Sequence, residues 1–363
     1  MNKKISQIEP EFGDEERIAL NHYMKEGGWV TEFKKTTELE DMIAKYTGSK
    51  HCIMVNNGTV SLILAGIACN ISHGDEVIIP NYTMIATPNS VKILGAKPIF
   101  VDVEEETLCI DLDEVKKKIT KKTKAIILVS SNGRYPEKGI EKITSFCNDN
   151  NLYLIEDAAQ SLGSFYPNGK HIGTEGIIGS FSFSPAKIIS TGQGGALITN
   201  DDNMAKKIRY LKDFGRSQGG NDVHDNIGFN FKFTDIQAVI GIEQMKKLEF
   251  RIKKKKLIYK EYSARLNKNK NFSLIYNNTD FTTPWFIELI VEKRDELIEF
   301  LNLNGIGTRL MYPPINKQKA YNESEDISVS EVIGTKGIWL PSSINLSISD
   351  IDFISNKITD FYK

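Results

Sequence analysis

Long apolar runs and a strong net charge are both missing from this sequence. No apolar run reaches the roughly 18 residues that a membrane-spanning helix needs, and residues 1–7 lack the apolar core of a signal peptide. The formal net charge is only −1, so the composition favours neither nucleic acid nor an anionic membrane as a partner. We therefore expect a cytoplasmic protein that binds neither nucleic acid nor membrane.

Cysteine and histidine are scarce and scattered. The four cysteines form no CxxC pair, which favours free, buried thiols in a reducing compartment. The five histidines form no HExxH motif, so the sequence predicts no metal site. The cysteines are Cys52, Cys69, Cys109 and Cys147.

The first half of the chain has a regular alternation of short apolar strands and helices. Its 363 residues are 40% hydrophobic and 26% charged, which suits a globular protein with one large and one smaller domain. The alternation predicts an α/β fold whose mostly parallel sheet is covered by helices on both faces. The expected strands are 52–55, 76–80, 97–102, 124–129 and 151–157, and the expected helices are 60–69, 86–94, 111–119 and 140–148.

The pattern changes near residue 248. A long helix is expected over 235–266, bent near Glu249, and a mixed α+β pattern follows it. We therefore predict a large domain over 1–248, including an N-terminal helical segment, and a small α+β domain over 249–363.

Two polar stretches are interpreted without a specific function. The lysine run 253–256 is expected to lie on a solvated face, because acidic residues balance the total charge. Residues 213–220 are expected to form a polar, glycine-rich loop.

The stretch around Lys187 has the strongest chemical signal. Phe181 and Phe183 alternate with serines in a short strand pattern, and Pro185 ends this pattern just before Lys187. A lysine beside hydroxyls and flexible glycines suits capture of a phosphorylated aldehyde through a Schiff base. The alternative is a solvated lysine in a surface loop. The glycines are Gly192, Gly194 and Gly195.

A strand–turn–helix at 52–69 is the second candidate element. The turn contains Gly58 and Thr59, and a helix N-terminus with glycine lets an anion approach main-chain N–H groups. The alternative is an ordinary capped helix with Thr59 as its N-cap.

Asp157 is the third candidate element. It lies at the carboxyl end of an apolar strand, where open α/β sheets place ligand-binding groups. A carboxylate buried there needs a cationic or hydrogen-bonding partner. The alternative is an N-cap for a helix that begins at Ala158.

These three elements, in this order and with their neighbours, resemble the DegT/DnrJ/EryC1/StrS family of sugar aminotransferases, and its perosamine-synthase-like members most. The resemblance covers nearly the whole chain from Trp29 onward and implies the aspartate-aminotransferase fold (fold type I) with pyridoxal 5′-phosphate as cofactor. The stretches that are similar are IEDAAQ, SFSFSPAK, TGQGGALITN and GFNFKFTDIQ.

The resemblance implies a role for each matching residue. Lys187 is similar to the lysine that binds the cofactor as a Schiff base and then moves protons as a general acid–base. Asp157 is similar to the aspartate that faces the pyridine nitrogen and keeps it protonated. Gln160 is expected to meet the phenolic oxygen of the ring.

The phosphate contacts follow from the same resemblance. Gly58, Thr59 and Ser182 are similar to the residues of the phosphate cup. Asn230 matches an asparagine that reaches the phosphate of a neighbouring subunit, which implies a homodimer with active sites at its interface.

Several positions differ from the usual pattern of the family. The aromatic residue that stacks on the cofactor ring is replaced by Met84, with Tyr82 as the alternative cover. The usual His-x-Tyr-Gly-Gln is Ser130-Ser-Asn132-Gly-Arg134, and the histidine after Tyr-Pro-Pro is Asn316. These changes leave the substrate open.

The resemblance implies an aminotransferase for a nucleotide-linked 4-keto-6-deoxy sugar of surface polysaccharide, with glutamate as the donor. A small phosphorylated ketone is an alternative substrate, with Arg134 or Arg309 as candidate anion partners. Trp29 and Tyr312 are further candidate substrate contacts. A related dehydratase has histidine in place of Lys187 and is disfavoured.

Two other classes fit the sequence poorly. A nicotinamide oxidoreductase needs a GxGxxG fingerprint, which the glycines after Lys187 do not form. A cofactor-sensing regulator needs a basic DNA-binding domain, for which the chain has no spare segment.

Overall fold

The computed structural model describes residues 4–217 and 222–363, which form two sheets with their helices. The larger sheet has seven strands in the order β1-β7-β6-β5-β4-β2-β3. Its strands are β1 His51–Val55, β2 Glu76–Pro80, β3 Lys97–Val101, β4 Thr123–Val129, β5 Tyr153–Asp157, β6 Ile178–Ser182 and β7 Gly195–Thr199.

One strand breaks the parallel arrangement of this sheet. β7 pairs antiparallel with both β1 and β6, whereas the pairs from β6 to β3 are all parallel. The carboxyl ends of the parallel strands therefore meet at one edge, where Asp157 ends β5 and Ser182 ends β6. The predicted mostly parallel sheet is confirmed.

Helices cover both faces of the large sheet, as β4 makes clear. Ile126 and Leu128 enter the core under one set of helices, while Ala125, Ile127 and Val129 enter the core on the other face. This alternation is why the strand is apolar throughout. The first set is α2 Lys34–Thr47, α5 Leu112–Lys118, α6 Ile140–Asp149 and α8 Asp235–Lys246; the second is α3 Gly58–Ala68, α4 Ala86–Lys92 and α7 Asp202–Lys212.

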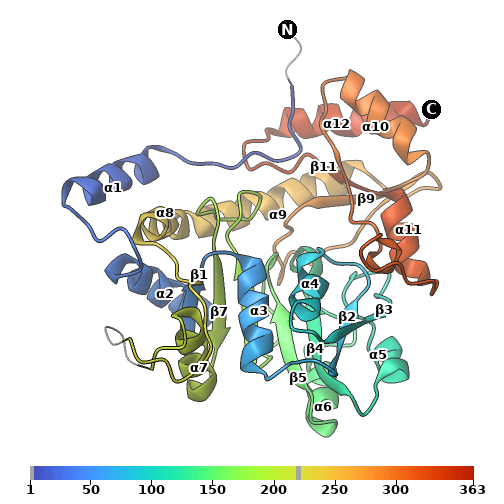
Figure 1. The fold of residues 1–363 in the computed structure, drawn as a ribbon. Helices are drawn as coiled ribbons and strands as arrows, with labels where there is room; N and C mark the ends of the chain where they lie inside the picture. The colour runs from blue at the N-terminus through green and yellow to red at the C-terminus, as the bar shows by residue number, and fades with distance from the viewer. Residues whose placement is uncertain (1–3, 218–221) are drawn as a thin grey trace.

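The smaller sheet has four strands in the order β10-β11-β9-β8, all antiparallel. The N-terminal segment before α1 Asp14–Lys25 lies beside this part of the chain (Figure 1). Its Ile5 forms a bridge with Ile306 and packs into the hydrophobic core of the smaller sheet. The strands are β8 Phe272–Leu274, β9 Ile287–Val291, β10 Arg309–Leu310 and β11 Gly337–Leu340; the helices are α9 Leu248–Arg265, α10 Arg294–Leu303, α11 Ser328–Lys336 and α12 Ile348–Phe361.

Helix α9 runs between the two sheets (Figure 1). The helix expected over 235–266 is two helices, α8 and α9, which meet at Lys247. The domain limits near residue 248 stay a prediction.

The expectation that the lysine run 253–256 lies on a solvated face is wrong for Lys255. Lys255 is buried, and its Nζ donates to the carbonyls of Trp285 (2.8 Å) and Ser342 (2.6 Å). Only one side of α9 faces solvent, so one lysine of the four turns inward.

Of the glycine-rich loop expected over 213–220, residues 218–220 lie outside the described residues. All four cysteines are buried and free, as predicted. Within 4–217 and 222–363, no helix is both long and apolar enough to cross a membrane.

Candidate active site

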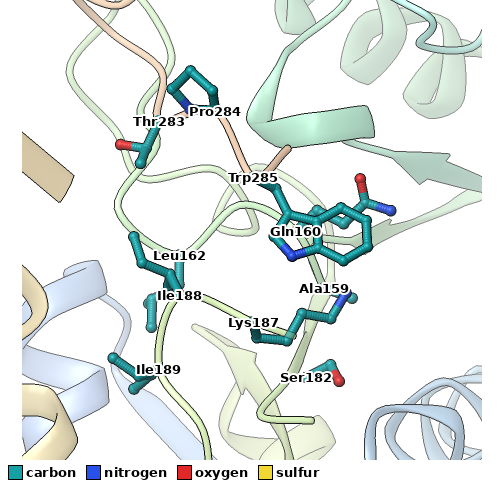
Figure 2. A pocket seen from close by; sticks show the side chains of 10 residues that line it. All are labelled: Ala159, Gln160, Leu162, Ser182, Lys187, Ile188, Ile189, Thr283, Pro284 and Trp285. Carbon is teal, nitrogen blue, oxygen red and sulfur yellow. The ribbon is translucent and has the colours of Figure 1, made fainter. Parts of the chain in front are cut away.

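Lys187 follows β6 by five residues and points into a pocket between the two sheets (Figure 2). Its Nζ lies 4.0 Å from the centre of the Trp285 ring, which forms the opposite wall. Trp285 is fixed by its own indole N–H, which donates to the Ala186 carbonyl at 2.7 Å. The pocket is lined by Ala159, Gln160, Leu162, Ser182, Lys187, Ile188, Ile189, Thr283, Pro284 and Trp285.

The electrostatics of Lys187 differ from those of a surface lysine. Burial lowers the pKa of its amine to about 8, Asp157 opposes this change, and the charge of Arg309 adds to it. An amine with this pKa exchanges its proton readily near neutral pH, as a general acid–base requires. The surface-loop alternative for Lys187 is therefore disfavoured.

Asp157 is buried at the carboxyl end of β5, two residues before Ala159 of the pocket. Thr87 Oγ1 donates to its Oδ2 at 2.7 Å, and the Ala159 N–H donates to its Oδ1 at 3.2 Å. Burial raises the pKa of this carboxyl, while these two hydrogen bonds and the charge of Lys187 lower it. Residues 159–160 form a turn, so Asp157 does not cap a helix.

The start of α3 is capped by Asn57 and not by Thr59. Asn57 Oδ1 accepts the Val60 N–H at 2.9 Å, which leaves the Thr59 side chain free of the capping role. The other N–H groups of a first turn have no intrahelical acceptor.

Gly58 allows this helix start to approach the end of β6. A Cβ at Gly58 would lie 2.8 Å from the Ser182 Cβ, so any side chain at this position would collide with Ser182. A Cβ at Gly195 would likewise lie 2.4 Å from the Asn57 carbonyl oxygen, so a side chain would not fit there. Part of the glycine cluster thus serves close backbone packing around the helix start.

Gln160 lines the pocket beside Trp285 (Figure 2). Its Oε1 accepts the Asn132 main-chain N–H at 2.7 Å. The carbonyl end of this amide is therefore engaged by the protein.

A comparison with known proteins can now be set against this geometry. The sequence model of the DegT/DnrJ/EryC1/StrS aminotransferase family matches residues 11–359. The chain belongs to the DegT/DnrJ/EryC1/StrS aminotransferase family.

Individual relatives of this aminotransferase family align over nearly their whole length. The chain is 34% identical over 369 residues to the GDP-perosamine synthase of Escherichia coli O157:H7 and 33% identical over 367 residues to that of Vibrio cholerae; both alignments cover 99% of each chain. A DegT DnrJ EryC1 StrS aminotransferase from Brucella abortus has a TM-score of 0.89 at 28% identity, with 96% of this chain and 95% of that chain covered. The predicted family, fold and aminotransferase activity are confirmed.

Within this DegT/DnrJ/EryC1/StrS fold, the two candidate covers of the cofactor ring differ. Met84 is 45% exposed, and its sulfur accepts the Ala86 N–H at 3.0 Å. Tyr82 is buried and packs its ring 6.0 Å from that of Tyr312. Burial in this aromatic cluster leaves Met84 as the candidate cover.

Arg134 is not a free anion partner, which corrects the sequence-based expectation. The residue is only 4% exposed, and its Nη1 forms an ion pair with Glu288 at 2.6 Å. Its Nε donates to the Thr107 carbonyl at 2.6 Å. Its two Nη atoms have no hydrogen-bond partner among the described residues, so burial and the ion pair with Glu288, not saturation of its donors, separate Arg134 from a ligand.

Arg309 remains as the candidate anion partner. It is exposed on β10, lies 5.3 Å from the Trp339 ring and acts electrostatically on Lys187. Tyr312 is close by, because Arg309 and Asp157 both influence its pKa, which burial raises to about 12.

Asn316 has a structural role in this chain. It is fully buried and exchanges two hydrogen bonds with Asn81, at 2.9 and 3.0 Å. Its Nδ2 also donates to the Glu325 carbonyl at 2.5 Å. This pair joins the end of β2 to the loop after β10.

Trp29 and Asn230 lie outside the pocket of a single chain. Trp29 is 65% exposed and Asn230 is exposed. Both flank the start of α8: Tyr23 links the Trp29 carbonyl to Asp235, and Asn230 precedes that residue by one short segment. The roles expected for Trp29 in substrate binding and for Asn230 at a neighbouring subunit's phosphate stay predictions.

Two residues of the site were missed by the sequence analysis. Thr87 looks like an ordinary hydroxyl at the start of a helix, and Trp285 like the first residue of an apolar strand. Neither local pattern indicates that the side chain meets Asp157 or Lys187, because those contacts join separate segments.

Proposed function

We propose that this protein is a pyridoxal-phosphate-dependent aminotransferase that moves an amino group from glutamate to a keto group of a nucleotide-linked 4-keto-6-deoxy sugar, for surface polysaccharide. The observation that carries the proposal is the placement of an amine and a carboxyl at neighbouring strand ends: buried Asp157 ends β5, two residues before Ala159 of the pocket, and half-buried Lys187 follows β6 and lines the same pocket.

The residues fit this cofactor. Asp157 receives two hydrogen bonds and has further lone pairs for a protonated ring nitrogen. The start of α3, with Gly58, Thr59 and the nearby Ser182, offers N–H and hydroxyl donors to a phosphate. When bound, pyridoxal phosphate supplies an aldehyde and an electron-withdrawing ring.

The proton chemistry falls to Lys187 and Asp157. In this proposal the Lys187 amine, with a pKa of about 8, would take the proton from the α-carbon of the amino donor and return it to the carbon that carries the cofactor's aldehyde. Asp157 would face the ring nitrogen and accept a hydrogen bond from it when that nitrogen is protonated. Trp285 confines the Lys187 amine from the opposite wall.

The relatives named GDP-perosamine synthases support a nucleotide-sugar substrate. In this proposal Arg309 binds a phosphate of the nucleotide or the carboxylate of the donor, and Tyr312 lines the same entrance. A small phosphorylated ketone is the second candidate substrate, because one exposed arginine also suits a single phosphate group. A dehydratase is disfavoured by the presence of Lys187.

We further propose a homodimer in the cytoplasm. Exposed apolar side chains concentrate on both sides of the α8 start, at Trp29, Val30, Phe33, Ile227 and Phe229. In a dimer, Asn230 reaches the phosphate of the neighbouring site. Buried, free cysteines suit a reducing compartment.

The test is direct amino transfer by the purified protein. With pyridoxal phosphate and glutamate, we expect 2-oxoglutarate to form in a single half-reaction, and a GDP-linked 4-keto-6-deoxy sugar to restore the starting cofactor spectrum. A panel of small keto-phosphates under the same conditions distinguishes the second candidate. The absence of 2-oxoglutarate, with Lys187→Met as the blank, would contradict the proposed function.

A further inference from the structure

The loop after β4 has an unusual backbone at Asn132. This residue has φ 53° and ψ 30° and is 2% exposed. Asparagine is one of the few side chains that adopt this left-handed conformation readily. The loop is therefore built around a residue whose side chain can also form hydrogen bonds in the interior.

The Asn132 side chain joins this loop to the smaller sheet. Its Oδ1 accepts the Phe286 N–H at 2.6 Å, and its Nδ2 donates to the Phe286 carbonyl at 2.9 Å. One amide thus pairs with both main-chain groups of Phe286, as a neighbouring strand would. Phe286 follows Trp285, the pocket wall above Lys187.

The main chain of Asn132 contacts a second residue of the pocket, Gln160. Its N–H donates to Gln160 Oε1 at 2.7 Å. A glutamine amide has one acceptor oxygen and one donor nitrogen, so this bond leaves the NH₂ group as the end available to a ligand.

Arg134 completes this connection. Glu288 Oε2 accepts Asn132 Nδ2 at 3.0 Å and forms the ion pair with Arg134 Nη1 at 2.6 Å. Asn132 and Arg134 are two of the positions where this chain differs from the usual family pattern, and they share one carboxylate. The two changes therefore form one buried network.

From these contacts we infer that Asn132 is a positioning residue, which fixes the Gln160 amide with its NH₂ group toward the cofactor and ties it to the strand that carries Trp285. The inference rests on the proposed function. The Gln160 NH₂ group is then a preset donor to an oxygen of the cofactor ring. If this amide rotated by half a turn, its Nε2 donor would face the Asn132 N–H donor, and its Oε1 acceptor would face the oxygen of the cofactor ring.

The experiment is a double-mutant cycle on cofactor binding. Asn132→Gly keeps the main-chain N–H that meets Gln160 and permits the same backbone conformation, but it removes the side-chain bonds to Phe286 and Glu288 that hold this N–H in place. We expect it to raise the dissociation constant of pyridoxal phosphate by about tenfold and to shift the visible absorption maximum of the bound cofactor. In a Gln160→Ala background, the same substitution should change the constant by less than about twofold, because interacting residues are non-additive.

Asn316→Ala is the matched control. Asn316 is an equally buried asparagine that joins the same two parts of the chain through Asn81. We expect both single variants to lower the melting temperature of the apoprotein. Only the effect of Asn132→Gly on cofactor binding should depend on Gln160. If Asn132→Gly does not fold, Asn132→Ala also removes the amide, places no second carboxylate beside Glu288, and should show the same dependence.

The outcomes separate the inference from the proposed function. Equal effects of the Asn132 variants with and without Gln160 would overturn the positioning role, although wild-type protein still binds cofactor and transfers amino groups. Wild-type protein that binds no pyridoxal phosphate contradicts the proposed function and, with it, this inference.

Discussion

Two lysines, buried Lys255 and half-buried Lys187, contact the same tryptophan. Lys255 donates to the Trp285 carbonyl and to the Ser342 carbonyl, whereas Lys187 lies 4.0 Å from the Trp285 ring and faces the pocket. Burial lowers the pKa of both amines, to about 7 for Lys255 and about 8 for Lys187. Burial and a shifted pKa are therefore shared, and the difference lies in where the donors point.

Two adjacent carboxylates repeat this difference. Glu156 accepts the main-chain N–H groups of Gly173, Glu175 and Gly176 and the hydroxyl of Tyr166. Within the described part of the chain, Asp157 accepts hydrogen bonds only from Thr87 and Ala159. A polar group that is saturated by the protein stabilises the fold, and one with spare capacity beside a pocket is available for chemistry.

The largest expected difference is between Lys187→Met and Lys255→Met. We expect Lys187→Met to lower the rate of amino transfer by about 10⁴-fold or more, because it removes the nucleophile and the general acid–base together. Lys255→Met should stay within about tenfold of wild type, because the Lys255 amine donates to main-chain carbonyls and lies over the Phe286 ring, and does not face the pocket. Rates at saturating cofactor measure this. Near wild-type turnover by Lys187→Met would remove the distinction.

The carboxylate pair predicts opposite effects on rate and stability. Asp157→Asn should lower kcat by about 10²–10³-fold with little change in stability. A neutral amide stabilises the protonated ring nitrogen less than a carboxylate does. Glu156→Gln should lower the free energy of unfolding by about 3 kcal/mol, because an amide nitrogen cannot accept the N–H groups now bound. Urea unfolding and single-turnover rates measure both. A large stability loss in Asp157→Asn alone would reverse the assignment.

The pH dependence of stability separates the two lysines further. An unfolded lysine keeps its proton to about pH 10.4, but folded Lys255 loses it near pH 7. The unfolded chain therefore binds more protons between these values, so the free energy of unfolding should rise with pH across this window.

Lys255→Met should remove up to about 1.4 kcal/mol per pH unit from that slope. Lys187→Met should flatten the slope of the apoprotein only above about pH 8, where folded Lys187 loses its proton. Chemical unfolding of the apoproteins from pH 6 to 10 gives these slopes. If the free energy of unfolding of the wild-type apoprotein fell from pH 6 to 10, burial would not lower the pKa of Lys255 as proposed.

The smallest expected effect concerns the ring of Trp285. A cation above an aromatic face gains about 1 kcal/mol, so Trp285→Leu should lower the pKa of Lys187 by less than about one unit. Trp285→Phe retains a ring and should give a smaller shift. The pH dependence of Lys187 acylation, with Lys187→Met as the blank, measures this pKa. A higher pKa in the leucine variant would show that the ring excludes water more than it stabilises charge.

Much of the fold and the centre of the site follow from local patterns. The apolar strands predict the parallel sheet, and Asp157 and Lys187 are found because each follows such a strand. Strands β8 and β11 were missed because three and four residues are too few to show a pattern. Helix α11, which packs against β9 and β11, was missed as well. The alternative in which Thr59 caps this helix is wrong, because the cap is Asn57, two residues earlier in the chain.

The sequence by itself determined the family, the order of strands and helices around the larger sheet, and the residues at the carboxyl ends of β5 and β6, because these depend on neighbours along the chain. Only the tertiary structure decided that Arg134, Lys255 and Asn316 are bound internally while Arg309 is exposed. The physical reason is that the partners of these polar groups come from distant segments, so only packing determines which charges and amides remain available to a ligand.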